Sequence, residues 1–232
     1  ALLTGQAGLR TGAGLCTVAT DASVRGSLEA RVPDLMIEGL DMAGSPVADL
    51  TGVAEGKSCI AIGPGFGTGT ESAKLVEAVF ALDGMPIVAD ADAIGVFAGR
   101  HREMSRNGSE TVLTPHPGEM ARLLGISTSE VQADRIAIAS KTAAETGAVV
   151  VLKGAHSVVA HPVGRTVLNL SGSSALAKAG SGDVLTGTVG ALCAMGMDAW
   201  TAARLGGSLP RAAGDLIEEE LGYHTPMASA PR

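Results

Sequence analysis

Residues 59–90 read CIAIGPGFGTGTESAKLVEAVFALDGMPIVAD. Cys59–Ile62 is a short apolar run, a glycine-rich loop follows it, and Glu71–Leu82 then carries apolar residues at helical spacing. Pro86–Ala89 is a second short apolar run. A strand, a helix and a strand in this order are typical of a right-handed crossover between two parallel strands.

The same alternation extends on both sides of this stretch. Further buried strands are expected at Leu15–Thr20, Thr111–Thr114 and Val149–Leu152. Helices are expected at Gly118–Leu124, at Thr128–Thr146 with the Ser127/Thr128 pair and Glu130 as its cap, at Val184–Met195 and at Trp200–Glu220. Ser157–His161 and Arg165–Asn169 flank a short turn and predict a hairpin at the sheet edge. The pattern predicts an α/β fold with a mostly parallel central sheet and helices on both faces. Ligands are then expected at the carboxyl ends of the strands.

Composition narrows the function classes. A chain of 232 residues with 46% hydrophobic and 18% charged residues can bury one sizeable core, so a single domain is expected. No apolar run reaches the roughly 18 residues that cross a bilayer, and no basic start precedes an apolar stretch. We therefore expect a cytoplasmic protein without a membrane partner. The formal net charge of −7 and the scattered basic residues argue against a nucleic-acid partner.

The strongest local signal for chemistry is Gly180-Ser181-Gly182-Asp183, which runs directly into an apolar helix. Glycines at a helix entrance let backbone N–H groups point at an anion, and the helix dipole adds partial positive charge there. Asp183 in the first turn is suited to accept a proton from a substrate hydroxyl. The alternative is a glycine-rich turn in which Asp183 is an ordinary first-turn residue.

Two further sets of residues follow expected strands. Gly63-Pro64-Gly65-Phe66-Gly67 would let the main chain approach a ligand closely, or would simply make a tight strand-to-helix turn. Asp90 and Asp92 follow the next strand, where they could position Mg²⁺ through water or where Asp92 could cap a helix. One of these two carboxylates is expected to be structural.

A histidine and a lysine complete the candidates. His116 lies between two prolines in Thr114-Pro115-His116-Pro117-Gly118-Glu119, which would hold its imidazole rigidly at a strand end where it could donate to a substrate. Lys153 follows the strand Val149–Leu152 and precedes a glycine-containing turn, a place that suits a nucleotide phosphate. A structural histidine and a surface lysine are the alternatives. Glu119 is expected to be a first-turn helix carboxylate and nothing more.

Six segments in order resemble one known family: GAGLCTVAT, AIGPGFGTG, VADADAI, TPHPGEMARLLG, VVLKGAHS and AGSGDVLTG. They are similar to the NAD(P)H-hydrate dehydratases, a branch of the ribokinase-like superfamily. The resemblance implies a three-layer ribokinase-like sandwich and a hydro-lyase that uses ADP or ATP, with Mg²⁺, to return hydrated NADH or NADPH to the normal cofactor. A homo-oligomer is expected as well.

The resemblance assigns roles to particular residues. The nucleotide would be bound by Lys153, Gly154, Ala155, His156, Ser157, Gly180, Ser181 and Gly182. The hydrated nicotinamide would contact Gly65, His116 and Asp183, and Asp183 would be the catalytic residue. The terminal phosphoryl group would pass to the ring hydroxyl, and phosphate would then leave by elimination.

Family members normally carry a strand and a glycine-rich loop before the region that matches Ala1–Arg10, and the resemblance places Ala1–Arg10 in the helix that follows them. We therefore expect the single domain to lack that first strand. Two other functions stay open. One is a small-molecule kinase of the same fold, of the hydroxyethylthiazole or hydroxymethylpyrimidine type, against which the TPHPGE segment argues. The other is a nucleotide-binding protein without catalytic activity.

Overall fold

A six-stranded sheet forms the centre of the molecule in the computed structural model, which describes residues 1–106, 108–169 and 180–208. Its strands lie in chain order: β3 (Ile60–Ile62), β4 (Ile87–Ala89), β5 (Thr111–Leu113), β6 (Val149–Leu152), β7 (Ser157–Ala160) and β8 (Thr166–Asn169). The first four are parallel and the last two are antiparallel. This confirms the expected parallel strands and the hairpin at the sheet edge.

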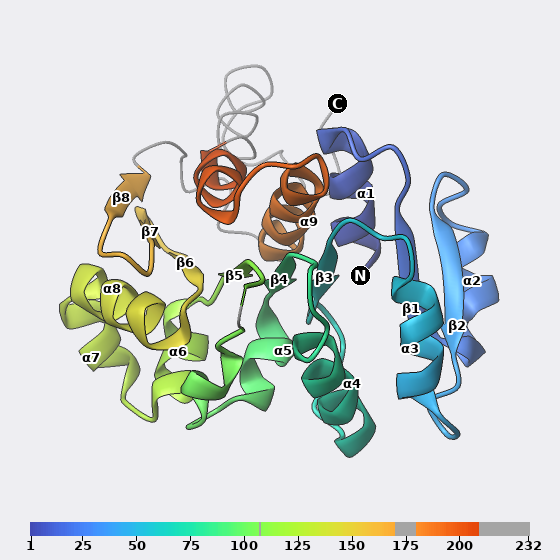
Figure 1. The fold of residues 1–232 in the computed structure, drawn as a ribbon, viewed down its shortest axis with the longest axis horizontal. Coiled ribbons are helices and arrows are strands. Elements are labelled where there is room, and N and C mark those ends of the chain that lie inside the picture. Colours follow the sequence, from blue (N-terminus) through green and yellow to red (C-terminus); the bar gives the residue numbers. More distant parts are fainter. Residues whose placement is uncertain (107, 170–179, 209–232) are drawn as a thin grey trace.

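Helices cover both faces of this sheet (Figure 1). On one face lie α1 (Leu2–Thr11), α9 (Ser181–Ala194) and the helical residues 199–208. On the other lie α4 (Thr70–Phe80), α5 (Ala91–Val96), α6 (Pro117–Leu124), α7 (Thr128–Ala133) and α8 (Arg135–Thr146). The central strands are apolar on both sides because each side faces a helical layer: Val150 and Leu152 of β6 pack into one core, and Val149 and Val151 pack into the other.

The N-terminal strands form a second, smaller sheet. β1 (Thr17–Asp21) pairs in parallel with β2 (Met36–Leu40), beside α2 (Arg25–Glu29) and α3 (Pro46–Ala54). The expected strand at Leu15–Thr20 is therefore present, but the described residues do not join it to the six-stranded sheet. A cavity of about 330 Å³ separates β1 from β3, with α1 and α9 contributing to its wall.

Capping determines where two of the helices begin. In α7 the Ser127 hydroxyl accepts a hydrogen bond from the Glu130 amide at 3.2 Å and the Glu130 carboxylate accepts one from the Ser127 amide at 2.9 Å, so the expected cap is confirmed. The single helix expected over Thr128–Thr146 is wrong. Asp134 leaves helical geometry, with φ −149° and ψ 81°, and its carboxylate accepts a hydrogen bond from the Ala137 amide to start α8.

The helix in which the resemblance places Ala1–Arg10 is confirmed as α1, and the helix considered after Asp90 and Asp92 is present as α5. The elements that were not expected from sequence are α2, α3, β2 and the short 3₁₀ turns Ala22–Val24 and His101–Met104. The helix expected at Trp200–Glu220 is confirmed as far as residue 208, and its remainder lies outside the described residues. None of the helices in the described part of the chain is long and apolar enough to span a bilayer.

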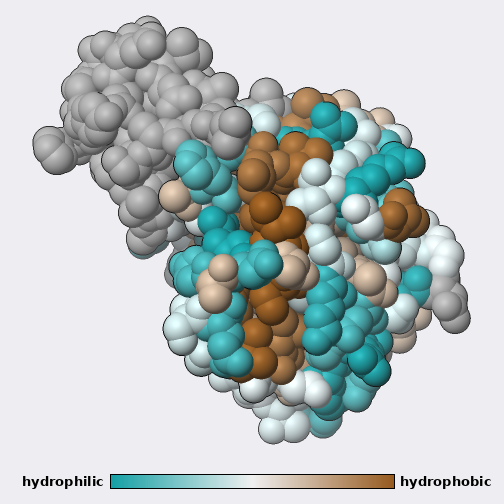
Figure 2. Space-filling view, turned by 90° about the vertical axis from the view of Figure 1, so that its left-hand side faces the viewer, coloured by the Kyte–Doolittle hydropathy of each residue, from teal (hydrophilic) through white to brown (hydrophobic). Residues whose placement is uncertain are grey.

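The side of the molecule that carries β8 has a band of hydrophobic residues (Figure 2). Val167 and Leu168 of β8, and Val163 in the turn before it, are exposed large hydrophobic side chains. Within the described ranges β8 has β7 as its strand partner, which makes it the outer strand of the sheet. Outer strands with exposed apolar side chains favour association with another surface.

Candidate active site

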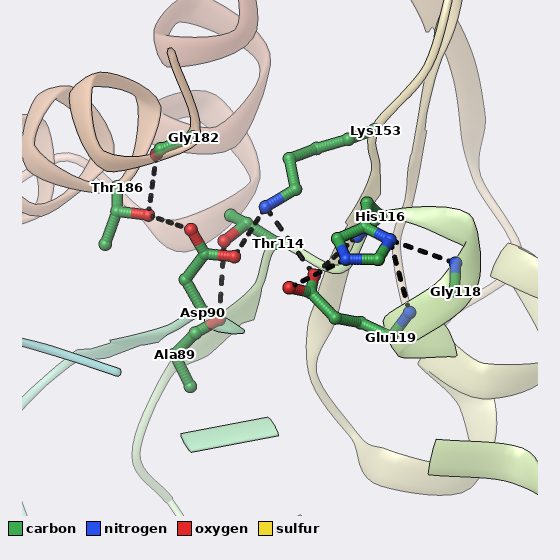
Figure 3. A network of polar contacts seen from close by, with 9 residues as sticks. All are labelled: Ala89, Asp90, Thr114, His116, Gly118, Glu119, Lys153, Gly182 and Thr186. Atoms are coloured by element: carbon green, nitrogen blue, oxygen red, sulfur yellow. Dashed lines mark hydrogen bonds and ion pairs between the residues drawn. The ribbon is translucent and has the colours of Figure 1, made fainter. Parts of the chain in front are cut away.

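The carboxyl ends of four neighbouring strands meet the N-terminus of α9 at one edge of the sheet (Figure 3). Backbone hydrogen bonds hold these ends together: the Asp90 amide donates to the Ile62 carbonyl at 3.0 Å, the Thr114 amide to the Ala89 carbonyl at 3.0 Å, and the Lys153 amide to the Pro115 carbonyl at 2.8 Å. The edge on which the parallel strands end is therefore where the candidate side chains gather, as expected for an open α/β sheet.

The loop after β3 depends on its glycines. Gly63 has φ 122°, and a β-carbon there would overlap the Asp90 carbonyl group, so only glycine fits. Gly65 has φ 68°, and a β-carbon there would have no other atom within 4 Å, so Gly65 lies beside open space. The Gly67 amide donates to the Asp92 carboxylate at 2.8 Å. Asp92 thus anchors the loop. The N-cap of α5 is Asp90, and Asp92 lies within the first turn of that helix, so the alternative in which Asp92 is the cap is wrong.

Asp90 and Lys153 form a buried ion pair. The Asp90 carboxylate is 2% exposed, and its Oδ1 atom lies 2.6 Å from Lys153 Nζ. Its Oδ2 atom accepts a hydrogen bond from the Thr186 hydroxyl of α9 at 2.9 Å. Glu119 is a second acidic neighbour of Lys153, with Oε2 3.7 Å from Nζ. Lys153 is therefore a lysine held inside the site rather than the surface lysine that was the alternative.

His116 is the N-cap of α6. Its Nδ1 atom accepts hydrogen bonds from the Gly118 amide at 3.0 Å and the Glu119 amide at 3.3 Å, and the Glu119 carboxylate accepts one from the His116 amide at 2.7 Å. A nitrogen that accepts carries no proton, so the proton of the neutral ring lies on Nε2, which is 3.1 Å from Glu119 Oε1. The His116 side chain is 49% exposed, so Nε2–H is presented at the site mouth in a fixed tautomer.

The entrance of α9 lies directly against the Asp90–Lys153 pair. Gly180 is its N-cap in left-handed geometry, with φ 91°, and no described side chain caps the first turn. A β-carbon at Gly182 would lie 3.3 Å from Lys153 Nζ and 3.5 Å from Asp90 Oδ2. Asp183 follows in the first turn with a side chain that is 33% exposed. A lysine ammonium and the positive end of a helix dipole thus meet at one place, which suits an anion.

The remaining candidates, Gly154 to Ser157, lie in the turn after β6 and differ in how far they are exposed. Gly154 packs against the Arg135 guanidinium, which donates to the Leu152 carbonyl at 3.0 Å and the Lys153 carbonyl at 3.1 Å. Burial lowers the pKa of Arg135. Ala155 and His156 are exposed, whereas Ser157 is buried at the start of β7. The strand-edge network thus includes Lys153, His116 and Gly182, and the structure sets Ser157 apart from the exposed turn.

Sequence reasoning missed three members of the site. Thr186 and Arg135 carry no local motif, and their roles depend on contacts across the fold. Glu119 was expected to be no more than a first-turn helix carboxylate, but it contacts both His116 and Lys153. The only available signal for Glu119 was its spacing of three residues from His116, which is the spacing of a capping box.

The described residues contain no group of three or more His, Cys, Asp or Glu side chains that could hold a metal ion. Asp90 is occupied by Lys153 and Thr186, and Asp92 by the Gly67 amide. Mg²⁺ is commonly held by one or two carboxylates together with substrate phosphates, so this arrangement fits a Mg²⁺ ion that is carried by a nucleotide and does not fit an all-protein cage.

A sequence profile of the NAD(P)H-hydrate dehydratase family matches residues 1–230. The bifunctional NAD(P)H-hydrate repair enzyme Nnr of Moorella thermoacetica is 40% identical over 233 residues, which is 97% of this chain and 44% of that protein. The ADP-dependent (S)-NAD(P)H-hydrate dehydratase of Neisseria meningitidis serogroup B is 42% identical over 164 residues, covering 69% of this chain and 55% of that protein. The chain thus spans about half the length of these curated relatives.

Solved structures show the same architecture. The ADP/ATP-dependent NAD(P)H-hydrate dehydratase of Bacillus subtilis, co-crystallized with ATP/Mg²⁺, superposes with a TM-score of 0.82 at 31% identity, covering 98% of this chain and 79% of that one. A ribokinase-like superfamily protein of Enterococcus faecalis superposes with a TM-score of 0.78 at 27% identity, covering 97% and 76%. The fold is therefore ribokinase-like, as the sequence resemblance implied.

Proposed function

Because the chain belongs to the NAD(P)H-hydrate dehydratase family, we propose that it catalyses the ADP- or ATP-dependent dehydration of hydrated NADH or NADPH. This is a hydro-lyase reaction of metabolite repair. The observation that carries the proposal is the meeting of Lys153 with the α9 entrance, where Gly182 lies against the lysine ammonium. A cation beside the N-terminal amides of a helix is an arrangement that binds a phosphate.

The nucleotide half of the site is proposed to extend from this point. Lys153 and the backbone of Gly180, Ser181 and Gly182 would hold the terminal phosphates. The turn Gly154-Ala155-His156, followed by Ser157, would contact the rest of the nucleotide. The exposure of Ala155 and His156 supports a contact by this turn. The Ser157 side chain is buried in β7, so we propose that Ser157 contacts the nucleotide through its backbone, where the turn joins the strand.

The hydrated nicotinamide is proposed to lie on the other side, against Gly65, His116 and Asp183. The open space at Gly65 admits a ring close to the main chain, and the Nε2–H of His116 is a fixed donor. A substrate oxygen would accept a hydrogen bond from this N–H, either together with Glu119 or in place of Glu119. The Asp183 carboxylate is partly exposed beside the anion-binding entrance, which supports its role as the base.

The proposed reaction has two steps. In the first step Asp183 takes the proton of the ring hydroxyl while the hydroxyl oxygen attacks the terminal phosphorus of the nucleotide. The nucleotide, shortened by one phosphoryl group, then leaves. Lys153 and the α9 amides stabilise the charge on the transferred group. The carbon–oxygen bond then breaks, phosphate departs with the bonding electrons, and loss of a ring proton restores the double bond. Mg²⁺ bound to the nucleotide would neutralise phosphate charge.

An absorbance assay at the reduced-nicotinamide band tests this proposal with hydrated NADH plus ADP, ATP or neither. We expect absorbance to recover only when nucleotide is present, with release of phosphate and AMP from ADP. Nucleotide binding without recovery would show that the chain is a silent nucleotide-binding protein. Recovery that does not require nucleotide would contradict the phosphoryl-transfer mechanism.

A homo-oligomer is also proposed. The exposed hydrophobic band over β8 in Figure 2 supports it, because the outer strand of a sheet is a common place for two copies to meet. Sedimentation equilibrium of the purified protein tests it. A single monomeric species at micromolar concentration would contradict the proposal.

A further inference from the structure

We propose that Asp90 is a positioning residue, whose buried carboxylate holds the Lys153 ammonium against the entrance of α9. The proposal rests on the proposed function in one respect, that Lys153 contacts the nucleotide. Neither a nucleotide contact nor a substrate contact is assigned to Asp90 itself. It acts through Lys153.

The backbone around Asp90 is constrained to place this carboxylate. Gly63 must lack a β-carbon because the Asp90 carbonyl group occupies that space. Ala91, the next residue, has φ 45° and is the only non-glycine residue in the described ranges with a positive φ. An alanine pays for this conformation in steric strain, and strained residues persist where the surrounding structure requires a particular placement. Two neighbouring constraints therefore fix the direction in which Asp90 leaves β4.

Both carboxylate oxygens are used by side chains from different layers of the fold. Oδ1 contacts Lys153 at the end of β6 at 2.6 Å, and Oδ2 accepts the hydrogen bond from Thr186 at 2.9 Å. Thr186 is fully buried, and its hydroxyl also lies 3.0 Å from the Gly182 carbonyl one turn earlier in α9. As Figure 3 shows, Asp90 therefore connects the lysine to the same turn of helix that forms the anion-binding entrance.

Lys153 has a competing partner. Glu119 Oε2 lies 3.7 Å from the same Nζ atom, on the side of the site occupied by His116. A lysine side chain is a point charge on a flexible stem, so its position depends on which carboxylate holds it. Asp90 is nearer than Glu119 by 1.1 Å, the difference between 3.7 and 2.6 Å. Removing the Asp90 charge should let Lys153 move toward Glu119 and away from Gly182.

Loss of the Asp90 charge is expected to lower the rate much more than it changes nucleotide affinity. Asp90→Asn removes a negative charge next to the phosphate site, which by itself favours a polyphosphate. It also misplaces the lysine, and a misplacement of about 1 Å in a reacting site costs on the order of 10²-fold in rate. We expect the ADP dissociation constant to change by less than about threefold, while kcat falls by about 10- to 100-fold.

Five variants of the whole chain, besides Asp90→Asn itself, separate positioning from folding. Thr186→Val removes the hydroxyl that holds Oδ2 and should lower kcat, whereas Thr186→Ser keeps the hydroxyl and should restore it. Glu145→Gln removes another carboxylate, one that pairs with His101 and Arg102 away from the strand ends, and should leave kcat unchanged. Asp90→Asn added to Lys153→Met should lower kcat no further than Lys153→Met alone, because residues that act through one contact are not additive.

A second measurement does not require turnover. Labelling of the Lys153 amine by an acylating reagent, followed by peptide mass spectrometry, should be several-fold faster in Asp90→Asn because the 2.6 Å ion pair with Asp90 is lost and only the longer contact with Glu119 remains. Unchanged labelling, or additive losses of kcat in the double variant, would overturn the Asp90 proposal. If the unsubstituted protein does not turn over hydrated NADH, the proposed function fails, and the labelling comparison still decides the role of Asp90.

Discussion

His116 has two roles that substitution can separate, one in the helix cap and one in the proposed substrate contact. Its Nδ1 atom caps α6 through the amides of Gly118 and Glu119, whereas its Nε2–H faces Glu119 and the open site. Asn is among the best N-cap residues and Ala is among the poorest. His116→Asn should therefore keep the cap and lose the imidazole N–H, and His116→Ala should lose both.

The magnitudes follow from these contacts. Loss of a helix cap costs about 1 kcal/mol, which lowers Tm by about 2–4 °C in a chain of this size. His116→Ala should show this loss in thermal unfolding, and His116→Asn should stay within about 0.5 kcal/mol of the unsubstituted protein. If Nε2–H donates to the hydrated nicotinamide, both variants should lose about two- to tenfold in kcat/KM, the range for one neutral hydrogen bond.

Differential scanning calorimetry and the nicotinamide absorbance assay measure the two effects on the same samples. Equal destabilisation by Asn and Ala would show that the side-chain cap does not stabilise α6. Full activity of His116→Asn would show that the imidazole makes no useful contact with substrate. The first outcome would refute the capping role of His116 and the second its substrate contact, and each result leaves the other role untested by that measurement.

Three further predictions concern the strand edge. Asp183→Asn should lower hydrate turnover by roughly 10²–10⁴ with little change in nucleotide binding, and normal turnover per folded molecule would remove Asp183 from the mechanism. At ADP 100 times above its Kd, binding should stabilise the fold by about 2.7 kcal/mol. If Lys153→Ala weakens the affinity tenfold, it should remove about 1.3 kcal/mol of this stabilisation in a thermal-shift titration, and an unaltered shift would exclude Lys153 from the nucleotide site. Gly63→Ala should lower the free energy of unfolding by more than about 1 kcal/mol because its backbone has φ 122° and the Asp90 carbonyl blocks a β-carbon. The matched Gly52→Ala, in helical α3 with open space, should stabilise by about 0.5–1 kcal/mol in urea unfolding, and similar losses in both variants would contradict the packing argument.

Periodicity located the elements that are buried on both sides. β6 (Val149–Leu152) has the bounds that the sequence predicted, because four consecutive β-branched or leucine residues between two helical layers leave little room for another interpretation. The helix break at Asp134 was missed, because the apolar spacing continues across it and only the cap contact with the Ala137 amide divides α7 from α8. β2 was missed because it contains Gly39 and Glu38 and is only partly buried, so it lacks the continuous apolar run of the central strands.

The sequence by itself determined the fold class, the family and the candidate groups at the strand ends, because strand–loop–helix order and glycine placement are local properties of the chain. Only the tertiary structure decided what those groups do to one another. Asp90, Lys153 and Thr186 are separated by at least 33 residues in the chain, as the difference between 186 and 153 gives, yet they share one ion-pair network. Their contacts arise because parallel strands bring their carboxyl ends to one edge and α9 returns to that edge, and no local pattern records the distance between side chains.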